Sequence, residues 1–439
     1  MQSTRRIANF ECSGCRKILP NNFSGYVCDS CGSNLWVNIQ FPDNITIREE
    51  FPNIWRYADL LALTDYQLDH FHEKSPHAFS VGGTPMFEYE KVATELNVKN
   101  FFVKFDGCNP SGSLKDRASH FIVERLAECP DMLIATASTG NAGAALSCCS
   151  APSPVNSLIF APAAAPAAKL AQILMYGSQL VAVEGTYDDA YILCDKLCKT
   201  YGWYNRSTGY NAFTTEGKKT VSFEIAEQLA KGSTSTFSAP DVVVVSVGDG
   251  NIISGVYKGF KDLLEAGLIQ KMPQICGIQS TNSPAVHECF SKGYNWEQIR
   301  DLPPMRSDTE ADSISAGKPS DCMKAVESVR KSNGDMVLVT DDEILSAIPH
   351  LACLTGVYAE PAAACGFAGI LKLSESGFLD GKSVVLLATG TGLKDTRRAI
   401  VGAEMYEQQD NTLLSGRLQV PKDVEGATQI LVDSNIISK

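Results

Sequence analysis

One lysine stands between a turn and a helix in the segment Asn109-Pro110-Ser111-Gly112-Ser113-Leu114-Lys115-Asp116-Arg117. Asn-Pro and Ser-Gly pairs favour turns, and from residue 118 onward apolar side chains recur at helical spacing. Lys115 is therefore expected at a helix N-terminus, where the dipole disfavours a positive charge and should lower the lysine's pKa. A lysine of this kind can form a Schiff base with a carbonyl. Taken alone, the segment is explained better by an ordinary solvated lysine, so the other motifs must decide.

Four cysteines near the N-terminus have the spacing of a metal site. Cys12 and Cys15 form one CxxC pair, and Cys28 and Cys31 form a second pair twelve residues later. This spacing is typical of two facing zinc knuckles, and it favours zinc over redox pairs or disulfides. Residues 1–40 have too small a core to fold without help, so we expect a structural zinc with four protein ligands.

Three loops follow apolar runs, at the position where α/β sheets bind ligands. Hydroxyl and N–H groups of Ser138-Thr139-Gly140-Asn141-Ala142-Gly143 suit a carboxylate. The backbone of Gly248-Asp249-Gly250-Asn251-Ile252 can wrap a phosphate, with the Asp249 carboxylate turned outward. A hydroxyl of Thr389-Gly390-Thr391-Gly392 can meet a ring nitrogen. With Lys115, these loops describe one ligand: an aldehyde cofactor with a phosphate arm and a ring nitrogen.

The strands that must position these loops are short and apolar throughout, and helical stretches separate most of them. They are expected at residues 101–105, 133–137, 157–160, 180–183, 242–245, 336–339 and 384–387. This pattern is typical of buried parallel strands with helical crossovers, so the fold class is α/β.

The lysine segment resembles that of threonine synthase, a pyridoxal-phosphate enzyme with the tryptophan-synthase-like fold (fold type II). The likeness runs through Gly82-Gly83-Thr84-Pro85, Ala137-Ser138-Thr139-Gly140-Asn141, Glu216-Gly217-Lys218-Lys219-Thr220, Glu360-Pro361-Ala362 and Thr389-Gly390-Thr391-Gly392-Leu393-Lys394-Asp395. Members often carry a four-cysteine zinc ribbon in front, similar to residues 12–31. The resemblance implies two doubly wound open-sheet domains preceded by a small zinc ribbon.

The resemblance also implies roles for individual residues. Lys115 would form the Schiff base with pyridoxal 5'-phosphate and later move the substrate's Cα proton. Asn141 would bond the ring hydroxyl, Gly248 to Ile252 would hold the phosphate, and Thr389 would meet the pyridine nitrogen. A neutral hydroxyl there suits elimination better than transamination. Ser138-Thr139 would take the substrate's α-carboxylate.

The positions expected to contact a substrate phosphate depart from the family's pattern. Threonine synthase uses a threonine, an asparagine and an arginine where this chain has Ala142, Thr186 and Ile192. Losing the arginine removes a planar fork suited to phosphate, a charge-assisted contact worth about 1.5–3 kcal/mol. Side chains that could take its place are those of Lys169, Asn205 and Arg206.

The implied activity is a threonine synthase-like lyase that performs β/γ-elimination or replacement on an activated, O-phosphorylated amino acid. The reaction that the resemblance implies by default is the conversion of O-phosphohomoserine to threonine. The altered positions keep two alternatives open: β-replacement on O-phosphoserine or a related serine ester, as in cysteine or cysteate synthases, and a serine or threonine dehydratase. An alternative of another class is a catalytically inactive zinc-ribbon binding protein.

Composition restricts the partners. The net charge is −12 and no basic run is present, which argues against nucleic-acid binding. We find neither a membrane-spanning apolar stretch nor the apolar core of a signal peptide. Fifteen cysteines are expected to be reduced thiols, which favours the cytoplasm. We expect a small amino-acid substrate and a homodimer.

The expected organisation is a zinc ribbon at residues 1–40, a linker at 41–78, a catalytic region at 79–400 and a C-terminal tail at 401–439. A smaller domain, about 115–215, would be inserted in the larger one. His70, His72 and His77 are expected on the linker surface. Lys218 and Lys219 are expected as an exposed pair at a helix start.

Overall fold

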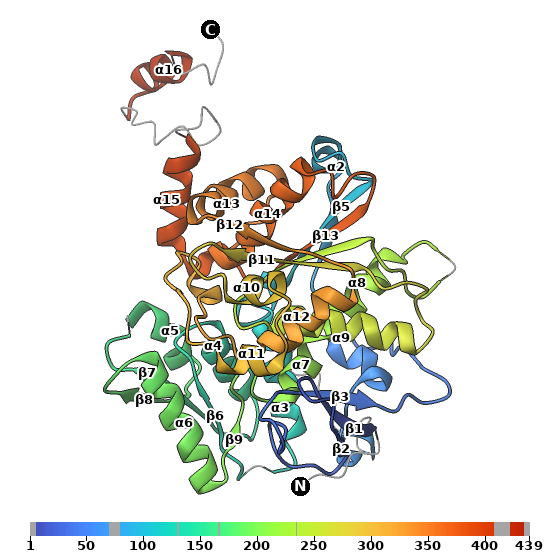
Figure 1. Ribbon diagram of the computed structural model, residues 1–439. Coiled ribbons are helices and arrows are strands. Elements are labelled where there is room, and N and C mark those ends of the chain that lie inside the picture. The colour runs from blue at the N-terminus through green and yellow to red at the C-terminus, as the bar shows by residue number, and fades with distance from the viewer. Residues whose placement is uncertain are drawn as a thin grey trace.

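A computed structural model of the chain describes residues 6–69, 80–129, 131–165, 167–233, 235–407 and 422–433. Within these ranges the strands form three sheets, with helices packed around them (Figure 1). None of the helices described is both long enough and apolar enough to span a bilayer. His70, His72 and His77 lie outside the described residues.

The largest sheet has six strands. In spatial order they are β12 (Met336–Val339), β11 (Gln274–Ser280), β10 (Val242–Ser246), β13 (Ser383–Ala388), β5 (Asn100–Phe105) and β4 (Met86–Glu88). All neighbours are parallel except β4, which pairs antiparallel with β5. Both faces are buried, because Val242 and Val244 belong to one core whereas Val243 and Val245 belong to another. Burial on both faces explains the unbroken apolar runs and confirms the α/β class.

A second sheet of four parallel strands lies in the chain between β5 and β10. Its order is β8 (Gln179–Val183), β7 (Ser157–Pro162), β6 (Ile134–Ala137) and β9 (Tyr204–Asn205). The proposed limits of a smaller domain, near residues 115 and 215, stay a prediction.

Helices cover both faces of the six-stranded sheet. Apolar residues of α9 (Asn251–Glu265) belong to one core, and those of α14 (Pro361–Glu375) belong to the other. The other α-helices that precede β9 in the chain are α1 (Asp65–Asp69), α2 (Glu90–Glu95), α3 (Lys115–Arg125), α4 (Asn141–Ser150), α5 (Ala167–Met175) and α6 (Tyr187–Tyr201). Those that follow are α7 (Ala212–Lys218), α8 (Thr220–Leu229), α10 (Ala285–Ser291), α11 (Trp296–Asp301), α12 (Cys322–Lys331), α13 (Asp341–Thr355), α15 (Thr396–Glu407) and α16 (Val424–Asp433). Short 3-10 turns are η1 (Ile54–Leu60), η3 (Asp106–Cys108), η4 (Asp312–Ile314) and η5 (Gly392–Lys394).

The N-terminal sheet consists of three antiparallel strands and packs on the body of the protein. Its order is β2 (Ile18–Pro20), β1 (Ile7–Cys12) and β3 (Leu35–Ile39). Phe10 and Trp36 are buried in the core to which α9 also contributes. The cysteine-bearing unit is therefore docked, with a hydrophobic core shared across the contact.

The described part of the expected linker, residues 41–69, packs into the body of the protein. Residues of η1 are buried in the main core, and Trp55 stacks on Phe121 of α3 with ring centroids 6.1 Å apart. The Trp55 Nε1–H donates to His120 Nε2 at 3.0 Å. The aromatic residues of this segment thus support the helix that begins at Lys115.

The expected boundary at residue 400 falls inside α15, which packs on α13. Residues 401–407, which were assigned to the tail, therefore continue a helix that packs on α13.

Candidate active site

Lys115 is the first residue of α3, as the turn-to-helix pattern predicted. Burial lowers the pKa of Lys115 to about 8, and the nearby charge of Arg206 acts in the same direction. The carboxylates of Asp249 and Glu360 oppose this shift. The direction agrees with the prediction, but its main cause is burial; a helix dipole alone does not account for it.

The loop before Lys115 is held against the end of β13. The Leu114 N–H donates to the Thr389 carbonyl at 2.8 Å, and the Thr391 N–H donates to the Gly112 carbonyl at 3.0 Å. Gly112 has φ +86°, a backbone conformation that glycine adopts most readily. The structure thereby brings Thr389 beside the lysine segment, although the two are far apart in sequence.

The Asp116 side chain stabilises the turn that precedes Lys115. Its carboxylate accepts hydrogen bonds from the Ser111 N–H at 2.7 Å and from the Ser111 hydroxyl. Burial raises the pKa of Asp116 to about 6, while the bonds from Ser111 oppose that rise. The serine and aspartate of the lysine segment therefore fix the turn that presents Lys115.

Arg117 anchors the start of α3 in the protein interior. Its guanidinium is fully buried, and Nε lies 2.6 Å from Asp106 Oδ2 while Nη1 lies 2.6 Å from Glu224 Oε1. Lys104 Nζ also donates to Glu224, at 2.6 Å. The Gly83 N–H donates to the same carboxylate at 2.9 Å, which ties the Gly82 to Pro85 segment to this network.

The loop after β6 joins the site through the N-terminus of α4. Ser138 is buried, and its hydroxyl accepts from the Gly140 N–H at 3.2 Å. Asn141, the first residue of α4, donates from Nδ2 to both carboxylate oxygens of Glu360, at 2.9 and 3.1 Å. Glu360 was not assigned a role from the sequence; burial raises its pKa. Its place in the Glu360-Pro361-Ala362 motif was the available signal.

The glycine loop joins β10 to α9 with little room for side chains. A Cβ on Gly248 would meet Ile314 Cα at 2.7 Å, and one on Gly250 would meet the Asp321 carbonyl oxygen at 2.8 Å. Gly250 also has φ +90°. Close packing therefore requires glycine at both positions.

Asp249 is half-buried, and the outward turn of its carboxylate stays a prediction. Its Oδ1 accepts from the Ser320 N–H at 3.2 Å, and the charges of Lys115 and Lys218 lie close enough to lower its pKa. Burial has the larger effect and raises the pKa overall. The positive charges of these lysines partly compensate for the burial of the carboxylate.

Lys218 and Lys219 do not form a surface pair; both are fully buried. Lys218 Nζ donates to Asn251 Oδ1, and burial holds its pKa well below the usual value, with Lys115 and Arg206 adding to the effect. Lys219 Nζ lies 2.6 Å from Glu216 Oε2. Sequence reasoning missed these groups because the carboxylate and amide partners of two adjacent lysines are not visible in the local pattern.

A cavity of about 560 Å³ lies between the turn before Lys115 and the loops after β6 and β13, and residues 248–252 do not line it. Thr139, Asn141 and Glu360 line it, together with Lys394, whose Nζ donates to Gln172 Oε1 at 2.8 Å. The Gln172 Nε2–H in turn donates to the Ser111 carbonyl at 2.9 Å. The cavity thus joins the lysine turn, the α4 N-terminus and the loop after β13.

The three positions that depart from the phosphate pattern lie near the ends of α4 and α6. Thr186 caps α6 and accepts from the Asp189 N–H, while the Ile192 side chain is 48% exposed. Ala142 lies in the first turn of α4.

Two of the side chains considered as replacements are used elsewhere. Arg206 is buried and donates to Ser119 Oγ at 3.1 Å, and Asn205 Oδ1 accepts from the Ser207 N–H at 2.9 Å. The side chain of Lys169 lies outside the described residues.

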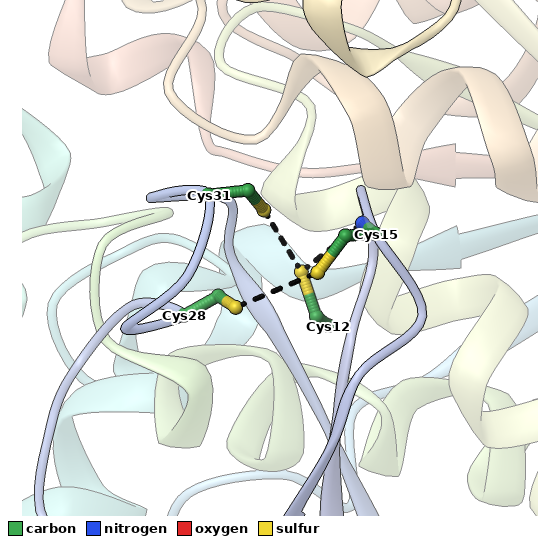
Figure 2. Close-up of side chains that lie close together, drawn as sticks. All are labelled: Cys12, Cys15, Cys28 and Cys31. Carbon is green, nitrogen blue, oxygen red and sulfur yellow. Dashed lines mark hydrogen bonds between the residues drawn. The ribbon is translucent and has the colours of Figure 1, made fainter.

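Cys12, Cys15, Cys28 and Cys31 converge as the spacing predicted (Figure 2). Their sulfur atoms all lie within 4.8 Å of one another. The Cys15 N–H points to Cys12 Sγ at 3.4 Å, and the Ser30 N–H points to Cys28 Sγ at the same distance. Four sulfur donors in this arrangement can hold one metal ion.

The chain was compared with known proteins. A family model described as "Pyridoxal-phosphate dependent enzyme" matches residues 78–390. Threonine synthase of Methanosarcina acetivorans is 34% identical over 381 residues, which cover 85% of this chain and 89% of that protein. Threonine synthase of Methanocaldococcus jannaschii is 34% identical over 402 residues, covering 90% and 94%.

Solved structures agree on the fold. A fungal L-serine ammonia-lyase from Rhizomucor miehei superposes with a TM-score of 0.61 at 22% identity, covering 74% of this chain and 98% of that one. Threonine deaminase isoform 2 of Solanum lycopersicum gives a TM-score of 0.61 at 21% identity, covering 73% and 87%. The chain therefore belongs to the pyridoxal-phosphate-dependent enzymes of fold type II, as a threonine synthase-like lyase with an N-terminal four-cysteine cluster.

Proposed function

We propose that this enzyme converts O-phosphohomoserine and water to threonine and inorganic phosphate. The observation that carries the proposal is the meeting of the Lys115 segment and Glu360 at the loop after β13. The Leu114 N–H donates to the Thr389 carbonyl at 2.8 Å, and the Glu360 N–H donates to the Gly390 carbonyl at 3.1 Å. The threonine synthase relatives, which match along most of the chain, support the same reaction.

The residues around Lys115 fit pyridoxal phosphate. Among the residues described, none forms a hydrogen bond with Lys115 Nζ, so the amine is available to a cofactor aldehyde. The N–H groups of Gly248 to Ile252, at the start of α9, would hold the phosphate. The Asn251 side chain is committed to Lys218, Thr215 and Asp321, so this residue would contribute its backbone.

When bound, the cofactor acts as an electron sink for negative charge at the substrate's Cα. Asn141 and Thr389 would orient it at the ring hydroxyl and the pyridine nitrogen. Lys115, with its pKa near 8, would take the Cα proton and return it at neutral to mildly alkaline pH. Ser138 and Thr139 would bind the substrate's α-carboxylate at the N-terminus of α4.

We further propose that Lys394 binds the substrate's distal phosphate. Its ammonium lines the cavity, whereas Thr186 is engaged as a helix cap and Ile192 has no charge. Burial lowers the pKa of Lys394, while the carboxylates of Glu360 and Asp116 oppose the shift. A cation in this position supplies the charge that the missing arginine would have carried.

A substrate panel tests the proposal. Purified enzyme with pyridoxal phosphate is supplied with O-phosphohomoserine, O-phosphoserine, serine or threonine, and phosphate, threonine and keto acids are measured. Equal amounts of threonine and phosphate from O-phosphohomoserine are expected. Phosphate released from O-phosphoserine only when sulfide or sulfite is added, with the matching β-substituted amino acid as product, would favour β-replacement, which the altered Ala142 and Ile192 positions keep as the second candidate. Keto acid from serine or threonine would instead indicate a dehydratase.

The cysteine cluster is proposed to bind zinc, because soft thiolate ligands in a tetrahedral set are typical of structural zinc sites. The fifteen cysteines are free thiols, which fits the proposed cytoplasmic location. We also propose a homodimer, to be measured by light scattering coupled to size-exclusion chromatography. A monomeric mass would contradict that assignment.

A further inference from the structure

The N-terminal cysteine unit makes a direct polar contact with the segment that supports the glycine loop. Asn34, three residues after Cys31, is buried. Its Nδ2 donates to Asp321 Oδ1 at 2.8 Å and to the Ser320 carbonyl at 2.6 Å. These bonds join residues that are more than 280 positions apart in the chain, so the contact is a feature of the docked fold.

Asp321 also forms hydrogen bonds with both residues that flank Gly250, Asp249 and Asn251. Its second carboxylate oxygen accepts from Asn251 Nδ2 at 2.8 Å. Its N–H donates to the Asp249 carbonyl at 3.0 Å. Asp321 is 1% exposed, so its oxygen atoms depend on protein donors. The position of Asp321 therefore helps to define the shape of the loop.

The cysteine knuckles fix the backbone of Asn34. Its carbonyl accepts from the N–H and the hydroxyl of Ser13, both at 2.9 Å, and Ser13 lies between Cys12 and Cys15. In the second knuckle, the Cys28 N–H donates at 2.8 Å to the carbonyl of Ser33, the residue before Asn34. Any ion that draws the four sulfurs together would hold Asn34 at the same time.

We propose that Asn34 is a positioning residue for the cofactor-phosphate loop, and that metal in the cysteine cluster raises the affinity for the cofactor's phosphate through it. The sequence of contacts runs from the knuckles to Asn34, then to Asp321, and from there to Asp249 and Asn251. The inference rests on the proposed function of Gly248 to Ile252 as the phosphate site. It gives the N-terminal unit a role in cofactor retention.

The test compares two ligands that differ only in the phosphate arm. Full-length apoenzyme is titrated at equilibrium with pyridoxal phosphate and with pyridoxal. In Asn34→Ala, loss of a buried hydrogen bond to a carboxylate should weaken pyridoxal phosphate binding by roughly tenfold and leave pyridoxal binding unchanged. Asn38→Ala is the matched control, because Asn38 Nδ2 donates to Asn9 within the same unit at 2.9 Å.

Three results would overturn the inference. In the first, Asn34→Ala binds both ligands as the wild type does; in the second, it loses affinity for both equally, as general loosening predicts. The third is an Asn38→Ala variant with the same selective loss. A wild type that does not prefer pyridoxal phosphate over pyridoxal would contradict the proposed phosphate site itself, and with it this inference.

Two further measurements test the pathway, and the second uses the wild type, so the test stays decisive if Asn34→Ala is poorly stable. In an Asp321→Asn background, Asn34→Ala should add less than about threefold to the loss, because both substitutions break one pathway. Full additivity would contradict the pathway. Removal of metal from the wild type by a chelator should weaken the binding of pyridoxal phosphate and leave the binding of pyridoxal unchanged. Addition of zinc should restore the affinity for pyridoxal phosphate. Unchanged affinity in metal-free protein would contradict the role of the metal.

Discussion

Arg117 and Glu224 form a two-pronged ion pair in the interior, with Nη1 to Oε1 at 2.6 Å and Nη2 to Oε2 at 2.8 Å. Arg117 follows Lys115 by two residues, and Glu224 lies in α8. The pair therefore joins the helix that carries the reactive lysine to a second helix more than 100 residues later in the chain. It stabilises the position of Lys115 without being part of its chemistry.

Substitution of Arg117 by alanine should destabilise the protein by about 3–5 kcal/mol, because the buried carboxylate of Asp106 loses its ion-pair partner and that of Glu224 retains Lys104 but loses the guanidinium. Urea unfolding measures the change in the free energy of unfolding. Arg300→Ala is the control, since Arg300 pairs with Asp301 at the surface and should have no measurable effect. Equal stability of the two variants would contradict the assigned network.

The reaction of Lys115 with the cofactor aldehyde should depend on pH with a midpoint near 8. Only the neutral amine attacks a carbonyl, and its fraction rises as the pH rises through the pKa. The initial rate should therefore rise roughly tenfold from pH 7 to pH 9 and then level off. Stopped-flow absorbance of apoenzyme mixed with pyridoxal phosphate follows this rate. A rise that continues without levelling to pH 10 would indicate a lysine with an ordinary pKa.

Substitution of Lys394 by glutamine should raise the KM for an O-phosphorylated substrate by about tenfold or more, because a charge-assisted contact to the phosphate is lost. Turnover of the unphosphorylated amino acid, where measurable, should not change in the same proportion. Lys292→Gln, which alters an exposed lysine paired with Glu288, is the control for charge alone. An equal loss on both classes of substrate would show that Lys394 acts on something other than the phosphate.

Substitution of Cys15 by serine should remove the bound metal and lower the thermal midpoint, because the small N-terminal sheet then loses a ligand that holds its knuckles. Metal content per chain and a thermal scan give the two readouts. Cys353→Ser is the matched control, since Cys353 is an exposed thiol outside the cluster. A wild-type protein that contains no metal would contradict the zinc assignment.

The start of α3 at Lys115 and the loops after β6, β10 and β13 were predictable, because turn residues and unbroken apolar runs are local signals. The buried partners of charged residues were not. Lys218 is an example, because it donates a hydrogen bond to Asn251, which lies 33 residues away in the chain. The residues next to Lys218 in the sequence do not predict this partner.

The burial of residues in η1 was hidden for a related reason. Trp55 stands in a segment that mixes apolar and charged residues, Ile54-Trp55-Arg56-Tyr57-Ala58-Asp59-Leu60, and its contact with Phe121 follows only from the tertiary fold. The charges that act on Asp249 likewise come from residues distant in sequence, Lys115 and Lys218. Local pattern located the site; the distribution of charge around it required the structure.

The central claim is that Lys115 carries the cofactor. Reduction of the purified, cofactor-loaded enzyme with borohydride, followed by digestion and mass spectrometry of the peptides, tests it directly. The account predicts a pyridoxyl-phosphate mass increment on the peptide that contains Lys115, and no such increment in Lys115→Ala. An increment on Lys218 or Lys394 instead, or none in the wild type, would contradict it.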